Sequence, residues 1–192
     1  MKKLHFLLLV TLSAFLSQLE ILSAQVNPYQ YTISKTAQGK NGAVASAHPI
    51  ASMVGLEILK QGGNAFDAAI ATQLALAVVY PGAGNIGGGG FLVAHTQKGK
   101  TISIDYREKA PAASSRNMYL DQNGNPQMEL SQNGHLASGV PGTIAGLFSS
   151  HKYGKLPFAK LIQPAIDLAE NGFVITPAEA RSLNGSKSAF VK

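Results

Sequence analysis

A chain of 192 residues, 45% hydrophobic and 14% charged, is long enough to bury a sizeable core and too apolar to be intrinsically disordered. Its formal net charge of +6 comes from cations scattered along the sequence, without a stripe that alternates with aromatic residues, so we expect no nucleic-acid partner. The chain has no cysteine, which excludes disulfides and thiolate metal sites. Its five histidines are too dispersed for metal-ligand spacing, and we expect no metal site.

The N-terminal segment has the pattern of an export signal. Met1-Lys2-Lys3 is a short basic start, residues 4–16 are mostly apolar, and Ser23-Ala24 offers small residues for cleavage. The apolar run is too short and too interrupted to span a membrane as a helix, and no other segment approaches such a length. We therefore expect residues 1–24 to be a signal peptide, residues 25–192 to be the exported part, and the protein to be periplasmic or secreted.

The first elements expected after the signal are a strand and a helix. The small-residue run 42–47 suits a buried strand. Pro49 fits the first turn of a helix that continues to Lys60, because proline has the backbone angle of a helix and needs no partner for an N–H there. Gly62-Gly63 is a typical helix stop.

A second helix is expected over residues 64–79. Asn64 is a favourable N-cap, and Asp67 places a negative charge in the first turn, where the helix dipole favours it. Alanine and other apolar residues cover the helix almost all round. A helix without a polar face is typical of a position at the centre of a domain.

The next segment, residues 81–90, contains six glycines in ten residues. Its Gly82-x-Gly84-x-x-Gly87 spacing matches the dinucleotide-binding pattern. That pattern must leave a strand and enter a helix, because the pyrophosphate lies at the helix N-terminus. Here a helix precedes the glycines and a strand follows them. We therefore expect no nucleotide cofactor, and a loop whose glycines let helix and hairpin pack tightly.

A hairpin and several helices are expected beyond the glycine run. The sequence predicts strands over 91–97 and 101–106, joined by a turn at Lys98-Gly99, with Ile102 and Ile104 on one face. A further turn is expected at residues 121–126. The remaining expected elements are helices over residues 143–153, 157–170 and 177–183, the first with Thr143 as its N-cap. The last has no natural stop, which we interpret as truncation of a longer chain.

No complete catalytic constellation is visible, and the best single candidate is Arg107. It follows the end of a predicted strand, where side chains reach clefts, and its planar guanidinium binds a carboxylate with two hydrogen bonds. The alternative is a surface ion pair with Asp105 or Glu108, which would contribute little. From the residues alone, the surface ion pair is the favoured interpretation.

Four motifs in sequence order carry a resemblance to a known family. They are QGGNAFDAA at 61–69, PGAGNIGGGGF at 81–91, DYREKAP at 105–111 and GHLASGVPGT at 134–143. From about Lys40 onward the chain closely resembles the N-terminal region of the large subunit of gamma-glutamyltransferases (glutathione hydrolases).

The resemblance implies an α+β fold, the αββα sandwich of N-terminal nucleophile hydrolases, with only its N-terminal portion present here. It implies a precursor that cuts itself to expose a threonine at the start of a small subunit, which is the expected protein partner. The threonine hydroxyl attacks the gamma-glutamyl carbonyl with its own amine as the base. The acyl-enzyme then passes the glutamyl group to water or to an amino acid or peptide. Glutathione and other gamma-glutamyl compounds are the implied substrates, and no cofactor is implied.

For the site residues, the resemblance assigns Arg107 to the α-carboxylate of the substrate, with Glu108 as a residue that orients it. No catalytic residue is assigned within the chain, because the nucleophilic threonine is expected beyond Lys192. The chain alone is therefore expected to be inactive. The processing motif is not matched at Thr96, Thr101, Thr143 or Thr176.

Two alternatives stay open from the sequence. One is a related acylase of the same superfamily that acts on a cephalosporin side chain or a poly-gamma-glutamate capsule. The other is a stand-alone non-catalytic domain, or the product of a disrupted reading frame. The DNA downstream would separate them, since continuation into a small subunit headed by threonine supports the enzyme.

Overall fold

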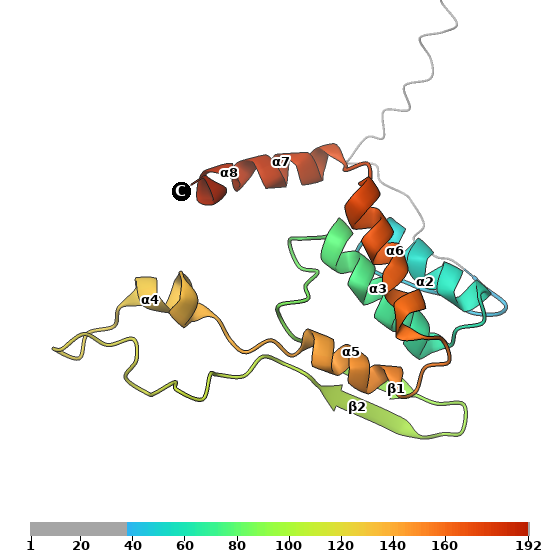
Figure 1. Ribbon diagram of the computed structural model, residues 1–192, viewed down its shortest axis with the longest axis horizontal. Coiled ribbons are helices and arrows are strands. Elements are labelled where there is room, and N and C mark those ends of the chain that lie inside the picture. The colour runs from blue at the N-terminus through green and yellow to red at the C-terminus, as the bar shows by residue number, and fades with distance from the viewer. Residues whose placement is uncertain (1–37, 192) are drawn as a thin grey trace, which may run out of the picture. The chain divides into compact units, whose positions relative to one another are not determined.

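The structure is a computed structural model that describes residues 38–191, so the predicted signal peptide at 1–24 lies outside the described residues. The chain divides into two units after Gln38, and the second unit contains the elements described below. This unit is mixed α and β, with one antiparallel pair of strands among the described residues (Figure 1). In chain order, its elements are α2 (Pro49–Lys60), α3 (Ala65–Val79), β1 (Phe91–His95), β2 (Thr101–Asp105), α4 (Met128–Gln132), the 3-10 helix η2 (His135–Ala137), α5 (Thr143–His151), α6 (Phe158–Asn171), α7 (Pro177–Gly185) and α8 (Lys187–Phe190).

Helix α3 is the centre of the helical layer. It packs against α2, α5 and α6, and Figure 1 shows α2 and α6 beside it. One core cluster joins these helices through Ile58, Ile70, Ala71, Leu74, Leu147, Leu161 and Ala165. Burial of a side chain such as Leu161, which has no exposed surface, stabilises the fold by roughly 1.5–3 kcal/mol. The expectation that the all-apolar helix is central is confirmed.

The start of α3 is fixed by a reciprocal capping box. The Asn64 side chain accepts hydrogen bonds from the backbone N–H groups of Phe66 at 2.9 Å and Asp67 at 3.2 Å. In return, Asp67 Oδ2 accepts from the Asn64 backbone N–H at 2.8 Å. The predicted cap is therefore confirmed, and the helix begins where the sequence pattern placed it.

The Asp67 carboxylate also binds the connection between α5 and α6. It is fully buried, and it accepts hydrogen bonds from the backbone N–H groups of Lys155 at 2.9 Å and Leu156 at 3.3 Å. The Asn64 amide adds a hydrogen bond to the Tyr153 carbonyl at 2.7 Å. A buried carboxylate is tolerated only with such partners, because taking an unpaired charge out of water costs several kcal/mol. One side chain therefore caps α3 and holds the loop that leads into α6.

The hairpin follows the predicted register closely. Strand β1 pairs with β2 antiparallel, from Phe91 opposite Asp105 to His95 opposite Thr101. Ile102 is buried and Ile104 half-buried on one face, as expected from the alternation. Helix α5 packs against β2, as Figure 1 shows. The strands are one or two residues shorter than predicted.

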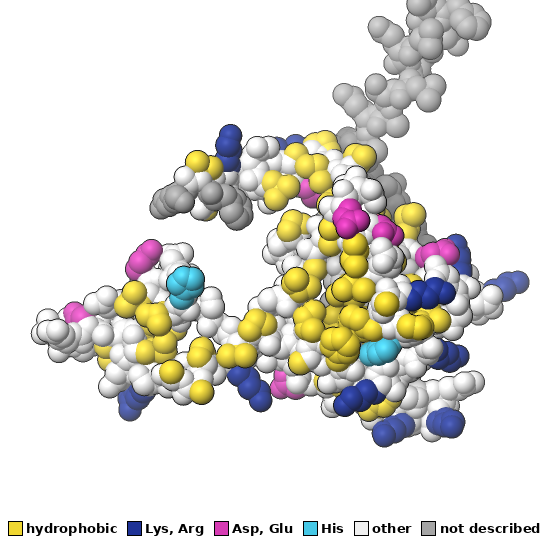
Figure 2. All heavy atoms as spheres, viewed as in Figure 1, with side chains coloured by type: hydrophobic (Ala, Val, Ile, Leu, Met, Phe, Trp, Pro, Cys, Tyr) yellow, Lys and Arg dark blue, Asp and Glu magenta, His cyan; other side chains and the backbone are white. Residues whose placement is uncertain are grey.

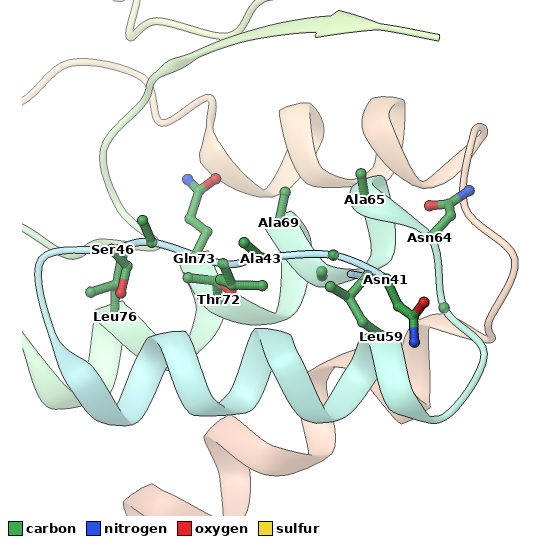
Figure 3. A pocket seen from close by; sticks show the side chains of 15 residues that line it. Asn41, Ala43, Ser46, Leu59, Asn64, Ala65, Ala69, Thr72, Gln73 and Leu76 are labelled. Carbon is green, nitrogen blue, oxygen red and sulfur yellow. The ribbon is translucent and has the colours of Figure 1, made fainter. Parts of the chain in front are cut away.

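The strand predicted over residues 42–47 is wrong for the described structure. No strand is formed there, and the segment runs beside α2 and α3 without backbone hydrogen bonds to another strand of the described chain (Figure 3). A strand requires a neighbour that takes its N–H and C=O groups. The sequence pattern indicates only that the segment is suited to such pairing.

The stop after α2 and the predicted helices α5, α6 and α7 agree with the sequence, whereas α4, η2 and α8 were not predicted. Gly62 has φ of +92° just after α2, a backbone angle that favours glycine. Helix α6 runs through Pro164, and α7 begins with Pro177 in its first turn. The turn predicted at residues 121–126 is present, with Leu120 bridging to Pro126.

The beginnings of α2 and α7 are joined through His48. This side chain is buried, its Nδ1 accepts from the Ile50 backbone N–H at 3.2 Å, and its Nε2 lies 3.0 Å from a Glu179 carboxylate oxygen. A neutral ring that accepts at Nδ1 carries its proton at Nε2, so it donates to Glu179. The Thr176 backbone N–H also donates to Glu179, at 2.6 Å. Mainly because of the hydrogen bonds from Thr176, the pKa of Glu179 is lower than usual.

We predict that Asp67→Ala lowers the free energy of unfolding by about 3 kcal/mol, because it removes the capping box and leaves two buried N–H groups of the 155–156 loop without partners. Urea unfolding of the chain and its variant measures the difference. Asp167→Ala, at an exposed carboxylate of α6, is the matched control and should change stability by about 0.5 kcal/mol at most. Equal losses in both variants would contradict the role of Asp67.

The lowered pKa of Glu179 predicts a pH-dependent contribution to stability. A carboxyl group whose pKa is lower in the folded state stabilises above its unfolded pKa, and this contribution is lost as pH falls through the folded pKa. The thermal midpoint of the wild type should therefore exceed that of Glu179→Gln at pH 7. This difference should narrow below about pH 4.5 and vanish under the lowered pKa. Glu170→Gln, at an exposed position of α6, should show no such pH-dependent difference.

Candidate functional site

Arg107 and Glu108 lie directly after β2, as the sequence predicted, in a short irregular segment over residues 106–109 that we call the turn of Arg107. The turn is held at both ends by backbone hydrogen bonds. At one end, the Tyr106 N–H donates to the Gly90 carbonyl at 3.1 Å. At the other, Lys109 and Val140 exchange two hydrogen bonds of 3.3 and 2.8 Å. The segment that carries Arg107 is therefore a fixed part of the fold.

The Arg107 side chain is exposed and borders two hollows. One, of about 270 Å³, lies between the end of β2 and α5. The other, of about 620 Å³, is also lined by Glu108 and by residues of the 110–119 and 136–139 segments. The arrangement presents a cation to two concave surfaces.

The predicted surface ion pair of Arg107 is not formed. Within residues 38–191 its guanidinium makes no salt bridge, whether with Asp105 or with Glu108. Asp105 Oδ1 accepts instead from the Arg107 backbone N–H, at 3.0 Å. The N–H donors of the guanidinium therefore have no carboxylate partner within residues 38–191.

The residue before Arg107 fixes the turn from three sides. The Tyr106 hydroxyl donates to Gln73 Oε1 of α3 at 3.1 Å. Its ring lies against Gly146 and Gly90, where an added Cβ would come within 2.1 and 2.8 Å of ring carbons. Gly84 similarly lies against the Leu76 carbonyl of α3, where a Cβ would be 2.0 Å from the oxygen. The expectation that glycines of residues 81–90 permit close packing is confirmed for Gly84, Gly89 and Gly90, whereas an added Cβ on Gly82 or Gly87 would meet nothing within 4 Å.

Two residues near the turn were not identified from the sequence as part of the site. Thr143 was expected to cap α5, but the N-cap is Gly142, without a side-chain cap hydrogen bond. The Thr143 side chain is fully buried, and its hydroxyl donates to Asn85 Oδ1 at 2.6 Å. One signal was available: Asn85 has the only side chain in residues 81–90 with hydrogen-bonding groups.

A different hollow, of about 730 Å³, lies between residues 41–46 and helices α2 and α3 (Figure 3). Its labelled residues are Asn41, Ala43, Ser46, Leu59, Asn64, Ala65, Ala69, Thr72, Gln73 and Leu76. None of its lining residues is acidic, basic or otherwise titratable. The hollow therefore offers no general acid or base, and the turn of Arg107 is the better candidate site.

The described residues have neither a concentrated patch of positive charge on the viewed face nor a cluster of metal ligands. Figure 2 shows Lys and Arg side chains at separate points on the viewed face, and hydrophobic side chains gathered over α3 and α6. Between residues 38 and 191 no three His, Asp or Glu side chains come together as a potential metal site. In the same range, no helix has the length and hydropathy needed to cross a membrane.

Comparison with known proteins gives consistent matches. The profile of the family described as Gamma-glutamyltranspeptidase matches residues 51–192. The glutathione hydrolase proenzyme of Escherichia coli (strain K12) is 50% identical over 147 residues, which are 76% of this chain and 25% of that protein. The chain thus spans about a quarter of the length of this curated relative.

Solved structures show the same relationship. The gamma-glutamyltranspeptidase of Helicobacter pylori is 48% identical, with a TM-score of 0.78 over 81% of this chain and 45% of that one. A cephalosporin acylase from Bacillus halodurans is 32% identical, with a TM-score of 0.67 over 85% of this chain and 31% of that one. The resemblance found in the four motifs is confirmed over most of the described residues. The chain belongs to the gamma-glutamyltranspeptidase family.

Proposed function

We propose that the chain is the N-terminal part of the large subunit of a gamma-glutamyltransferase (glutathione hydrolase), exported as a precursor to the periplasm or the medium. The complete enzyme cleaves the gamma-glutamyl amide of glutathione and transfers the glutamyl group to water or to an amino-acid or peptide acceptor. This proposal is supported by family membership together with one observation, the exposed guanidinium of Arg107 on a fixed turn. The relative from Escherichia coli is itself named a glutathione hydrolase proenzyme.

In this proposal Arg107 binds the α-carboxylate of the gamma-glutamyl group. A carboxylate that leaves water needs a cation in fixed geometry, and the guanidinium supplies two parallel N–H donors to its two oxygens. The absence of an ion pair between Arg107 and any carboxylate in residues 38–191 supports this role, because substrate need not displace an internal partner. Glu108, in the same segment, is the proposed support of the arginine, although within residues 38–191 its carboxylate lies against Gly89 and forms no salt bridge with the guanidinium.

The covalent chemistry belongs to a threonine of the small subunit. Its hydroxyl attacks the gamma-glutamyl carbonyl while its own amine takes the proton, and the amide nitrogen departs protonated. Water or an acceptor amine then attacks the resulting ester. In this division of roles the chain supplies binding and orientation, and the small subunit supplies the nucleophile.

We propose the αββα sandwich of N-terminal nucleophile hydrolases for the complete protein. The hairpin β1–β2 is then part of a larger sheet, whose other strands come from outside the described residues. The exposed Phe91 and Val93 on β1 support this, since an outward row of large apolar side chains is usually covered. Segment 42–47, which has strand composition without a paired neighbour, supports it as well.

We predict that Arg107→Lys impairs the complete enzyme more than conservation of charge implies. Lysine keeps the charge and loses the two parallel N–H donors. The transition state should lose about 1.5–3 kcal/mol of stabilisation, so kcat/KM should fall roughly 10- to 150-fold. The measurement uses a full-length chimera in which this chain replaces the matching quarter of the Escherichia coli proenzyme. A gamma-glutamyl anilide is the substrate, and the 192-residue chain alone is the expected inactive control.

A second substrate shows whether the loss concerns the carboxylate. The 4-aminobutyryl anilide is the same molecule without its α-carboxylate, so Arg107→Lys should leave its kcat/KM unchanged. Equal loss on both substrates would mean that Arg107 is structural. A chimera that cleaves a cephalosporin side chain and not the gamma-glutamyl anilide would favour the acylase alternative, for which the 32% identity to the Bacillus halodurans enzyme is the supporting observation.

A further inference from the structure

The turn that carries Arg107 rests on two segments that are distant in the sequence. One is the glycine loop, residues 85–90, and the other is the start of α5, residues 142–146. At the loop, an added Cβ on Gly89 would lie 2.6 Å from a Glu108 carboxylate oxygen and 2.7 Å from its backbone nitrogen. At α5, an added Cβ on Gly142 would lie 2.0 Å from the Tyr106 carbonyl oxygen. The backbone of 106–108 thus lies in direct contact with both supports.

These two supports are joined to each other by hydrogen bonds. The Gly88 carbonyl accepts from the backbone N–H groups of Gly142 at 2.8 Å and Thr143 at 3.1 Å. The Asn85 side-chain oxygen accepts from the Gly88 N–H at 3.0 Å and from the Thr143 hydroxyl at 2.6 Å. Thr143 has no exposed surface, so water does not compete for this hydroxyl.

The bond from Thr143 to Asn85 is the one side-chain hydrogen bond between these supports among the described residues. It closes a ring that runs from the hydroxyl through the Asn85 amide and Gly88 back to the start of α5. Without it, Asn85 keeps only its bond to Gly88 in the described structure, and the loop is held to α5 only by the two backbone bonds to the Gly88 carbonyl, which leave it more room to shift. Because both supports touch residues 106–108, such a shift moves the Arg107 backbone.

We propose that Thr143 is a positioning residue, whose hydroxyl bond to Asn85 sets where the Arg107 guanidinium meets the substrate carboxylate. This proposal rests on the function proposed above for Arg107. It differs from a general role in stability, because a stabilising residue affects all substrates alike. A positioning residue affects only the substrate that uses Arg107.

The test compares Thr143→Val with Thr143→Ser in the full-length chimera. Valine keeps the shape and removes the hydroxyl. KM for the gamma-glutamyl anilide should therefore rise about 2- to 12-fold, which is the change expected from the loss of one neutral hydrogen bond. KM for the 4-aminobutyryl anilide should stay within about twofold, and serine should restore the wild-type value. Thr72→Val is the matched control, since this buried threonine has no hydrogen-bond partner for its hydroxyl among the described residues.

A double variant separates the two proposals. If Thr143 acts through Arg107, then Thr143→Val has no further effect on the gamma-glutamyl anilide in an Arg107→Lys background. If Arg107→Lys impairs both substrates equally, the carboxylate role of Arg107 fails. If Arg107→Lys is selective and Thr143→Val is silent or impairs both substrates equally, the positioning role fails by itself.

Amide hydrogen exchange of the unprocessed chimera supplies a measurement that needs no maturation or turnover. The amides of Tyr106 and Lys109 are protected by their bonds to Gly90 and Val140. Thr143→Val should speed exchange at both amides, while Thr143→Ser and Thr72→Val should not. Unchanged protection in Thr143→Val would overturn the positioning role.

Discussion

The buried carboxylate of Asp67 is the interaction on which the helical layer depends. Its cost of leaving water is offset by three backbone N–H groups and by its place at the positive end of the α3 dipole. The same carboxylate fixes where α3 begins and where the chain turns into α6. The core cluster between α3, α5 and α6 therefore forms beside a polar contact that ties the start of α3 to the loop between α5 and α6.

A second constraint is the close approach of glycine backbone to the ring and to the carbonyl of Tyr106. Gly90 and Gly146 accommodate its ring, and Gly142 lies against its carbonyl. Side chains larger than a hydrogen atom at these positions would push the turn away from α5 and from the glycine loop. Because these glycines let the hairpin pack closely on α5, the position of the Arg107 backbone is fixed. Of the three glycines that match the nucleotide-binding pattern, only Gly84 has such a packing role, against the Leu76 carbonyl.

Local signals in the sequence predicted the elements well, because each had its cause within a few residues. The capping pair Asn64 and Asp67 and the alternation in β2 are of this kind. The strand expected at 42–47 failed, since pairing depends on a neighbour that no local pattern supplies.

The candidate site likewise has one part that the sequence predicted and another that it did not. Arg107 was found from its place after a strand, and the resemblance gave it a role. The bond between Thr143 and Asn85 joins residues 58 positions apart, and Thr143 has the same local pattern as an N-cap. Only the tertiary structure distinguishes these uses of one hydroxyl. The hydrogen bonds that the Asp67 carboxylate accepts from the 155–156 loop were not predictable from the sequence for the same reason.

In the proposed enzyme, the orienting cation and the nucleophile belong to different subunits of one precursor. The orientation of the substrate then depends on how accurately each subunit positions its own group, since no covalent link joins the two subunits after cleavage. A guanidinium on a long side chain loses accuracy unless its backbone is fixed, and displacement of about 1 Å can cost a hundredfold in rate. The turn of Arg107 is fixed by contacts within residues 73–146 alone. In the proposed enzyme, the large subunit therefore holds its binding cation in place independently of the threonine that the small subunit contributes.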